Sequence, residues 1–167
     1  MANIIFIHGL ESTGYGFKAQ FFRNNLPECV TPDFEPFKTK LSFDVLLKKR
    51  MSQLITILKE QNSWNIIGSS FGGLMGAFYT LQYPNKVELL ILLAPLLAVP
   101  ELNPDKFRPI DIPVIIFHGK NDKIVSMRDS RNRATLLFKN LQYNVVEDDH
   151  MLQSTVTKIN WKEIIKP

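Results

Sequence analysis

Cysteine is nearly absent from this chain of 167 residues, which contains a single one at position 29. One cysteine excludes an internal disulfide, and it also excludes a cluster of thiolates that could hold a metal ion. Cys29 stands just before an apolar stretch. We therefore interpret it as a buried, inert thiol and not as a nucleophile.

Long hydrophobic runs and strong net charge are also missing. No stretch of about 18 uninterrupted apolar residues occurs, so no segment is expected to span a membrane. The first ten residues are apolar but lack a basic region, and they predict a strand instead of a secretion signal. The net charge is only +4, without a basic stripe interleaved with aromatic residues, which disfavours nucleic-acid binding. We expect a cytoplasmic protein that binds neither membranes nor nucleic acids.

The composition is that of an ordinary folded domain. Hydrophobic residues make up 45% of the chain and charged residues 22%, so disorder is not expected. The length suits one well-packed core. No internal repeat, low-complexity tract or linker interrupts the chain. The sequence therefore predicts a single domain over residues 1–167, and it does not distinguish a monomer from a homodimer.

Short β-rich runs alternate with longer helical patterns. Strands are expected at residues 3–7, 28–31, 64–67, 87–93, 114–118 and 143–147, and helices at residues 16–25, 42–61, 70–82, 127–139 and 151–165. Three of the strands are apolar on both faces, as in strands that helices cover from both sides. The pattern predicts an α/β fold of about six mostly parallel strands with helices on both faces. Residues 94–111 contain four prolines and are too few for a cap domain.

The most informative motif is Gly68-Ser69-Ser70-Phe71-Gly72, which has the spacing G-x-S-x-G. An apolar run precedes it and a helical pattern follows it. A serine on a tight turn from strand to helix presents its hydroxyl at the edge of the sheet. Ser70 is therefore the candidate nucleophile. The alternative is an ordinary loop of small residues, since so short a pattern also occurs by chance.

A serine hydroxyl needs an imidazole to accept its proton, and the chain has only three histidines. His8 follows the first expected strand and is better placed to shape the next loop. His118 ends another strand, where a structural hydrogen bond is its expected role. His150 follows the last strand and precedes an apolar helix start. Elimination favours His150 as the base.

Asp122 is the preferred carboxylate to orient this imidazole, because it lies in the turn after the strand at residues 114–118. A structural role in that turn is the alternative. Asp148 and Asp149 compete for the role, but they adjoin His150 in sequence and point in diverging directions. Parallel strands end at one edge of the sheet, where ligands bind, so all these side chains are expected at one rim.

With these residues in place, the chain resembles the α/β-hydrolase superfamily, and within it the small, lidless bacterial esterase-like proteins. The matching segments are F-I-H-G-L, G-S-S-F-G-G, H-G-K-N-D-K-I-V and D-D-H, in that order. The resemblance implies a compact α/β-hydrolase fold without a cap domain and a catalytic triad of Ser70, Asp122 and His150. It also implies that no metal and no organic cofactor take part. The first antiparallel hairpin of the family is missing here.

The expected reaction is hydrolysis of a small-molecule carboxylic ester or thioester with a small acyl group, through an acyl-enzyme on Ser70. The backbone N–H groups of Leu10 and Phe71 are expected to form the oxyanion hole. Residues expected to contact the substrate are His8, Gly9, Phe17, Leu96, Leu97 and Met151. The apolar members of this set could equally cap the core. Two alternatives stay open, namely a non-catalytic binding or regulatory protein, and an acyltransferase or perhydrolase that uses the same triad.

Overall fold

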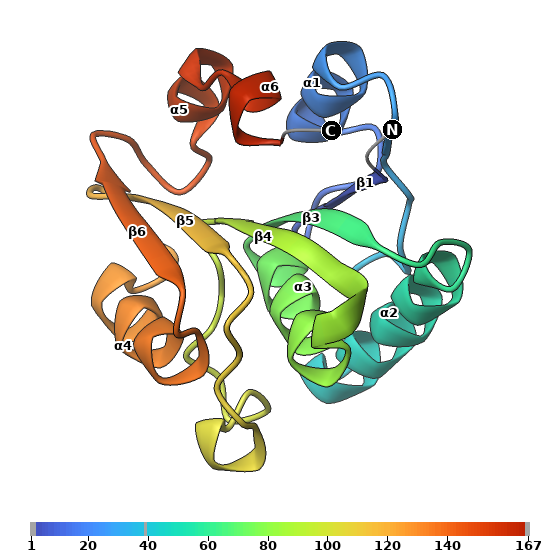
Figure 1. Ribbon diagram of the computed structural model, residues 1–167, viewed down its shortest axis with the longest axis vertical. Coiled ribbons are helices and arrows are strands. Elements are labelled where there is room, and N and C mark those ends of the chain that lie inside the picture. Colours follow the sequence, from blue (N-terminus) through green and yellow to red (C-terminus); the bar gives the residue numbers. More distant parts are fainter. Residues whose placement is uncertain (1–2, 39, 166–167) are drawn as a thin grey trace.

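A computed structural model describes residues 3–38 and 40–165 (Figure 1). Both ends of the predicted domain over residues 1–167 lie outside the described residues. Six strands form one sheet in the order β2-β1-β3-β4-β5-β6, and every neighbouring pair is parallel. The strands are β1 (Ile4–Ile7), β2 (Cys29–Val30), β3 (Trp64–Ser69), β4 (Val87–Leu93), β5 (Val114–Gly119) and β6 (Leu141–Val146).

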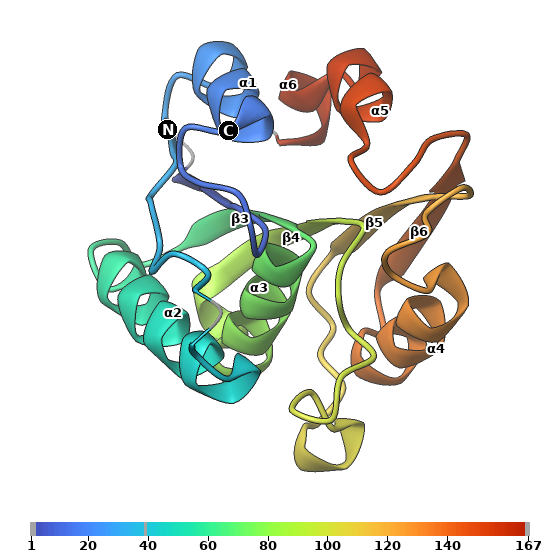
Figure 2. The ribbon, with the colours of Figure 1, turned by 180° about the vertical axis from the view of Figure 1, so that it is seen from behind.

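Helices cover both faces of the sheet, as the sequence predicts. They are α1 (Phe17–Asn25), α2 (Phe43–Leu58), α3 (Phe71–Gln82), α4 (Met127–Leu137), α5 (Gln153–Lys158) and α6 (Trp161–Ile164), with 3-10 turns η1 (Pro84–Lys86) and η2 (Pro104–Lys106). Helices α1, α5 and α6 lie on one face, and α2, α3 and α4 lie on the other (Figures 1 and 2). The predicted compact α/β-hydrolase fold is confirmed.

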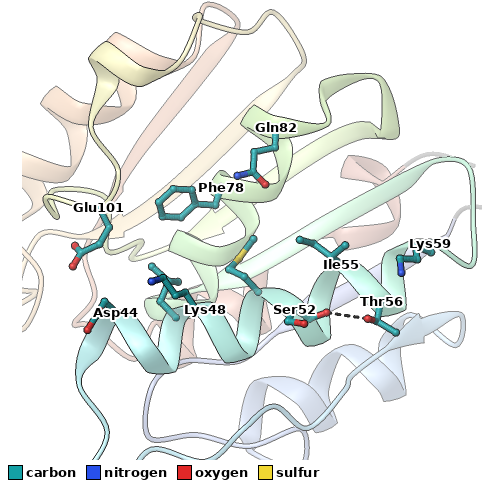
Figure 3. A pocket seen from close by; sticks show the side chains of 11 residues that line it. Asp44, Lys48, Ser52, Ile55, Thr56, Lys59, Phe78, Gln82 and Glu101 are labelled. Atoms are coloured by element: carbon teal, nitrogen blue, oxygen red, sulfur yellow. Dashed lines mark hydrogen bonds between the residues drawn. The ribbon is translucent and has the colours of Figure 1, made fainter.

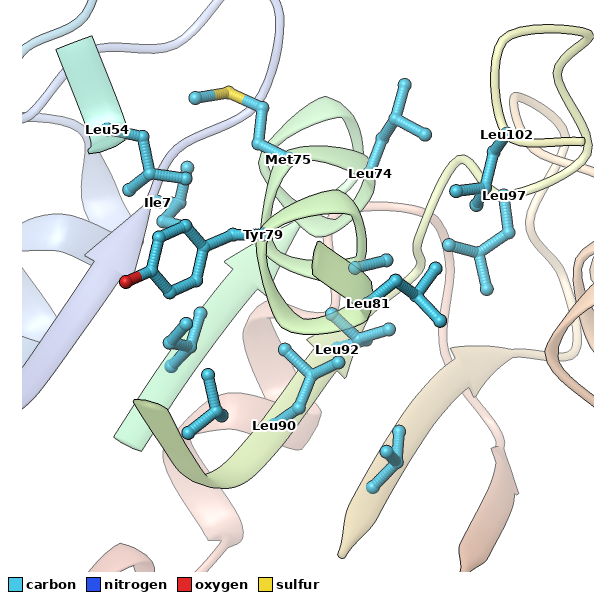
Figure 4. Close-up of a cluster of buried hydrophobic side chains, with 14 of the residues drawn as sticks. Ile7, Leu54, Leu74, Met75, Tyr79, Leu81, Leu90, Leu92, Leu97 and Leu102 are labelled. Atoms are coloured by element: carbon cyan, nitrogen blue, oxygen red, sulfur yellow. The ribbon is translucent and has the colours of Figure 1, made fainter. Parts of the chain in front are cut away.

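Each face of the sheet contributes to its own hydrophobic core. Because side chains alternate along a strand, Leu90 and Leu92 of β4 face one helical layer while Ile91 and Leu93 face the other. All four side chains are fully buried. Figure 4 shows the core on the side of α2 and α3, where the two leucines lie near the side chains of α3. The strands are apolar on both faces for this reason.

The predicted helix over residues 151–165 is wrong as a single element. It consists of α5 and α6, because the backbone of Ile159 is extended (φ −72°, ψ 135°). The break lets Trp161 turn back, so that its indole N–H donates to the Val156 carbonyl at 2.8 Å. Its ring packs edge-on against Phe22 of α1, with 4.8 Å between centroids. This tertiary contact outweighs the helical pattern of the sequence.

A crevice is expected where neighbouring strands send their chains to opposite faces of the sheet. Strands β1 and β3 are neighbours, yet β1 leads to α1 on one face and β3 leads to α3 on the other (Figures 1 and 2). Between β4 and β5, residues 94–111 contain η2 and no cap domain. In the part of the chain that the structure describes, no helix has both the length and the apolar character needed to cross a membrane.

Candidate active site

Ser70 occupies the turn between β3 and α3. Its backbone has φ 54° and ψ −112°, in the positive-φ region that residues other than glycine rarely adopt. Backbone hydrogen bonds hold this conformation: the Ser70 N–H donates to Leu93 at 2.9 Å, and the Ser70 carbonyl accepts from Leu96 at 3.1 Å. Such strain persists only where the surroundings impose it, and it is common at functional sites.

The turn also depends on Gly72, on the first turn of α3. A Cβ at this position would overlap the carbonyl oxygen of Ile7, and it would lie 2.6 Å from the carbonyl oxygen of His8. Only glycine therefore allows α3 to approach the end of β1 this closely. The close approach brings the start of α3 beside the loop that follows β1.

Three side chains from distant parts of the chain form a continuous set of hydrogen bonds, which we call the triad. His150 Nε2 lies 3.1 Å from Ser70 Oγ, and His150 Nδ1 lies 2.7 Å from Asp122 Oδ2. A carboxylate only accepts, so Nδ1 carries the proton and Nε2 is free to accept from the serine hydroxyl. The Asp122 side chain is fully buried, and that of His150 is 16% exposed.

Backbone groups hold Asp122 in place. Its Oδ1 accepts from the N–H groups of Ile124 at 2.8 Å and Val125 at 2.9 Å. Burial by itself raises the pKa of this carboxyl group. The hydrogen bonds from Val125, His150 and Ile124 outweigh burial, so the pKa of Asp122 lies below its ordinary value. Asp122 is therefore ionised at neutral pH and faces the imidazole as a carboxylate.

A second histidine, His118, also binds Asp122, which the sequence did not predict. Its Nε2 lies 3.0 Å from Asp122 Oδ2 and 3.3 Å from the Val125 carbonyl. Both partners are acceptors, so Nε2 carries the proton, and Nδ1 accepts from the Tyr143 hydroxyl at 2.7 Å. Burial lowers the pKa of His118, which favours the neutral ring. The spacing of four residues from Asp122 was the only signal in the sequence.

The competing carboxylates bind the loop and helix that follow β6. Asp148 Oδ2 accepts from both the N–H and the hydroxyl of Thr155, at 2.9 and 2.7 Å. Asp149 Oδ1 accepts from the N–H of Met151 at 2.9 Å. Within the described residues, neither carboxylate binds His150. They order the loop that presents His150, whereas Asp122 contacts its ring.

Two residues of the cleft lining have backbone N–H groups that no acceptor among the described residues satisfies. Phe71 is the first residue of α3, and the N–H of such a residue has no acceptor within its helix. Among the described residues, no acceptor is paired with the Leu10 N–H. Both residues line the same cleft as Ser70 and His150. These are the two positions predicted for an oxyanion hole.

The cleft has a volume of about 540 Å³ and an apolar rim. Four residues of the predicted substrate set line it: Gly9, Phe17, Leu96 and Met151. Ile124 also lines it and is 74% exposed, the largest exposed fraction among the large hydrophobic residues described. The sequence missed Ile124 because it lies in a turn without periodicity. Lys18 lines the cleft as well, and burial lowers the pKa of its ammonium.

In contrast to the prediction, two residues of the expected substrate set, His8 and Leu97, are not part of the cleft lining. His8 is 1% exposed, and its Nε2 accepts from the Phe34 N–H at 3.1 Å, so its proton lies on Nδ1. That Nδ1 donates to the Gly9 carbonyl at 2.8 Å. Leu97 is fully buried in the core under α2, α3 and α4. The ring of His8 shapes the loop after β1, and the side chain of Leu97 turns away from the cleft.

A second hollow of about 530 Å³ lies between α2 and α3 (Figure 3). Volume therefore does not distinguish the two. The lining of the second hollow includes Lys48, Ile55 and Phe78 but no histidine or cysteine. The Thr56 hydroxyl drawn there donates to the Ser52 carbonyl of its own helix at 3.0 Å. Of these two hollows, the cleft at Ser70 is the one in which a hydroxyl is hydrogen-bonded to an imidazole.

The single cysteine of the chain lies outside the cleft lining. Cys29 is buried, and burial raises the pKa of its thiol to about 12, so the thiolate is scarce at neutral pH. Among residues 3–38 and 40–165, no three His, Cys, Asp or Glu side chains gather as they would around a metal ion.

The fold is shared with solved structures of hydrolases. A protein from Xanthomonas campestris pv. campestris, described as a putative hydrolase of the alpha/beta superfamily, has a TM-score of 0.78 at 22% identity, covering 94% of this chain and 92% of that one. Est1E from Butyrivibrio proteoclasticus, with ferulic acid bound, has a TM-score of 0.75 at 16% identity, covering 99% of this chain and 90% of that one. Alpha/beta hydrolase domain-containing protein 10 from mouse has a TM-score of 0.68 at 18% identity, covering 92% of this chain and 84% of that one. At these identities the likeness concerns the fold.

Sequence comparison identifies the family. No protein with a curated description matches this chain. A model of the alpha/beta hydrolase family matches residues 36–152, which is more than half of the chain and includes Ser70, Asp122 and His150. The chain belongs to the alpha/beta hydrolase family.

Proposed function

We propose that the protein is a serine hydrolase that cleaves a small-molecule carboxylic ester or thioester. The observation that carries the proposal is the hydrogen-bonded set of Ser70, His150 and Asp122, with distances of 3.1 and 2.7 Å. The positive φ of Ser70 supports it, because strained backbone is common where a side chain must react. Membership of the alpha/beta hydrolase family is consistent with this chemistry.

In the proposed reaction, Ser70 Oγ attacks the acyl carbonyl while its proton passes to His150 Nε2. The carbonyl π electrons move onto oxygen, and the N–H groups of Leu10 and Phe71 donate to that oxyanion. The intermediate collapses, the bond to the leaving group breaks, and His150 protonates the departing alcohol or thiol. Water then attacks the acyl-enzyme, with His150 again as base, and releases the acid. Asp122 holds the imidazole tautomer and stabilises its charged form.

The cleft supports a substrate with a small apolar acyl group. Phe17, Ile124 and Met151 surround the opening with apolar side chains that are 46%, 74% and 51% exposed. Of residues 94–111, only Leu96 lines the cleft, so this segment does little to enclose a long chain. Contact with these side chains removes apolar area from water, which favours binding. A long acyl chain would remain mostly in solvent.

Hydrolysis of p-nitrophenyl esters from acetate to decanoate tests the proposal. Purified wild-type protein should release p-nitrophenol with kcat/KM highest for the short acyl groups, and the matching thioesters should be cleaved as well. Ser70→Ala should reduce turnover to the rate of the uncatalysed reaction, apart from a residual effect of the oxyanion hole. Its far-UV circular dichroism should match that of the wild type.

The outcomes separate the remaining functions. A folded wild-type protein that cleaves none of these esters contradicts the proposal and favours a binding role. Faster release of p-nitrophenol on adding an alcohol or peroxide, with formation of the new ester or peracid, would favour acyl transfer over hydrolysis. A kcat/KM that rises steadily to decanoate would contradict the preference for small acyl groups.

A further inference from the structure

Arg50, on α2, is a buried charge that the proposed reaction does not use. Its side chain is fully buried, and within the described residues it forms no ion pair. Burial lowers the pKa of its guanidinium, and the nearby charges of Asp33 and Glu35 oppose that shift. Removing a charge from water is costly, and an apolar side chain of similar volume is often at least as stabilising. A buried arginine therefore calls for an account of what it binds.

The guanidinium donates to three backbone carbonyls from two loops. Nε donates to Glu35 at 2.7 Å, and the two terminal nitrogens donate to Gly9 at 3.1 Å and Leu10 at 2.8 Å. Its central carbon also lies 5.1 Å from the centroid of the Phe71 ring. Arg50 thus contacts Leu10 and Phe71, the two residues whose N–H groups are predicted to form the oxyanion hole.

Peptide geometry connects these contacts to the cleft. The Gly9 carbonyl and the Leu10 N–H belong to one peptide unit, which is trans, so they point in opposite directions. Arg50 and the protonated Nδ1 of His8 both donate to that carbonyl, at 3.1 and 2.8 Å. The carbonyl points toward these two donors, and the Leu10 N–H therefore points away from them. Leu10 itself lines the cleft together with Ser70.

We propose that Arg50 is a positioning residue for the oxyanion hole. It holds the carbonyls of Gly9 and Leu10 and packs against the Phe71 ring, so that the N–H groups of Leu10 and Phe71 face the same point. The proposal rests on the proposed function of the Ser70 site. The bonds to the carbonyls of Gly9 and Leu10 fix the peptide units on both sides of Leu10. Donation to the Gly9 carbonyl also polarises that peptide, which strengthens the Leu10 N–H as a donor.

Arg50→Met and Arg50→Lys test this role. Methionine fills a similar volume without donors, and lysine keeps the charge but lacks the planar fork that spans several carbonyls. Three quantities are measured: kcat and KM for p-nitrophenyl acetate, and Ki for a trifluoromethyl ketone. Ser70 adds to that ketone, its proton passes to His150, and the ketone oxygen becomes an oxyanion in the hole.

We expect Arg50→Met to weaken the stabilisation of the tetrahedral oxyanion and to leave binding of the uncharged ester nearly unchanged. Arg50→Met should lower kcat by at least about tenfold, toward the roughly 10²–10³-fold cost of one lost donor, and raise Ki by a similar factor. KM should change by less than about threefold, because the ground-state carbonyl gains little from the hole. Arg50→Lys should recover part of both losses.

Arg133→Met is the matched control. Arg133 also donates to three loop carbonyls, those of Leu97, Val99 and Leu102, but none of these belongs to the loop after β1. Its removal should loosen residues 97–102, none of which lines the cleft, and leave kcat and Ki within about threefold of the wild type. Equal losses of kcat in Arg133→Met and Arg50→Met would overturn the proposal, and so would a folded Arg50→Met with wild-type kcat and Ki.

A measurement without turnover separates this proposal from the function on which it rests. A wild-type protein that neither cleaves esters nor binds the ketone contradicts the proposed function. The amide ¹⁵N and ¹H chemical shifts of Leu10 still report on the peptide itself. They should change in Arg50→Lys and stay unchanged in Arg133→Met. Unchanged Leu10 shifts in Arg50→Lys would overturn the positioning role, whatever the activity.

Discussion

Asp122 is the residue on which most of the polar contacts of the site converge. Its two oxygens contact two backbone N–H groups and the rings of His118 and His150. Each partner is a donor, so an ionised carboxylate satisfies all of them at once. An asparagine in its place would keep its oxygen on the two backbone N–H groups and present its N–H₂ group to the two rings. His150 Nδ1 would then have to accept a hydrogen bond, which reverses the preferred tautomer of His150.

We therefore expect Asp122→Asn to reduce kcat for p-nitrophenyl acetate by about 10⁴-fold, as a wrong imidazole tautomer does in serine hydrolases. The matched control is Asp149→Asn, because Asp149 is also an aspartate near His150 but binds the Met151 N–H. That variant should lose less than about tenfold. If Asp149→Asn loses as much as Asp122→Asn, then Asp122 is not the orienting carboxylate.

At the scale of elements, the position of α3 depends on glycine at its first turn. We predict that Gly72→Ala lowers the free energy of unfolding by at least about 3 kcal/mol, because the new Cβ would overlap backbone carbonyls that cannot move aside. Gly76→Ala is the control on the same helix. Its Cβ would meet only side chains, the nearest being Ile66 at 3.2 Å, and alanine favours the helix by about 1 kcal/mol.

Urea denaturation of the two variants measures the difference. Gly76→Ala should stay within about 1 kcal/mol of the wild type, since the gain in helix propensity offsets the tighter contact. Similar midpoints for Gly72→Ala and Gly76→Ala would show that α3 is free to move away from β1. The close approach of α3 to the loop after β1 would then not be a requirement of the fold.

The elements themselves show what the sequence can and cannot reveal. The strand predicted at residues 87–93 matches β4 because an apolar run bounded by turns depends only on local pattern. The sequence predicts substrate contact for both Leu96 and Leu97, yet only Leu96 of the two lines the cleft. An irregular segment has no period from which the direction of a side chain could be inferred. The break before Trp161 depends on a contact with Phe22, which is remote in sequence.

The same distinction applies to the candidate site. Ser70, Asp122 and His150 could be named because a motif, a position after a strand and elimination among three histidines each pointed to one residue. Their catalytic roles stay predictions. Arg50 could not be found this way, because an arginine on a helix pattern is usually exposed. Its burial depends on carbonyls at positions 9, 10 and 35, which only the tertiary structure brings together.

At the scale of the whole molecule, two buried histidines make stability depend on pH. Burial lowers the pKa of both His8 and His118 in the folded state below the ordinary value of 6.5. Below pH 6.5 the unfolded chain binds protons that the folded chain does not. The stability that the neutral rings of His8 and His118 contribute is therefore complete above about pH 6.5, and it is lost as the pH falls toward their pKa values in the folded state.

We predict that the free energy of unfolding, measured by urea denaturation, falls between pH 7.5 and pH 5.5. The slope from each histidine is at most about 1.4 kcal/mol per pH unit. His8→Asn and His118→Asn should each flatten this dependence of stability on pH. A pH dependence that is the same in the wild type, His8→Asn and His118→Asn would mean that neither buried ring resists protonation.

The proposed chemistry requires Ser70 to be an activated nucleophile. The most direct measurement is to incubate the protein with a fluorophosphonate, which reacts with activated serines, and to locate the adduct by mass spectrometry of its peptides. We expect one adduct per chain on Ser70, formed at least about 10²-fold more slowly in His150→Ala and absent from Ser70→Ala. A well-folded wild-type protein without an adduct, or with its adduct on another residue, would contradict the proposed chemistry.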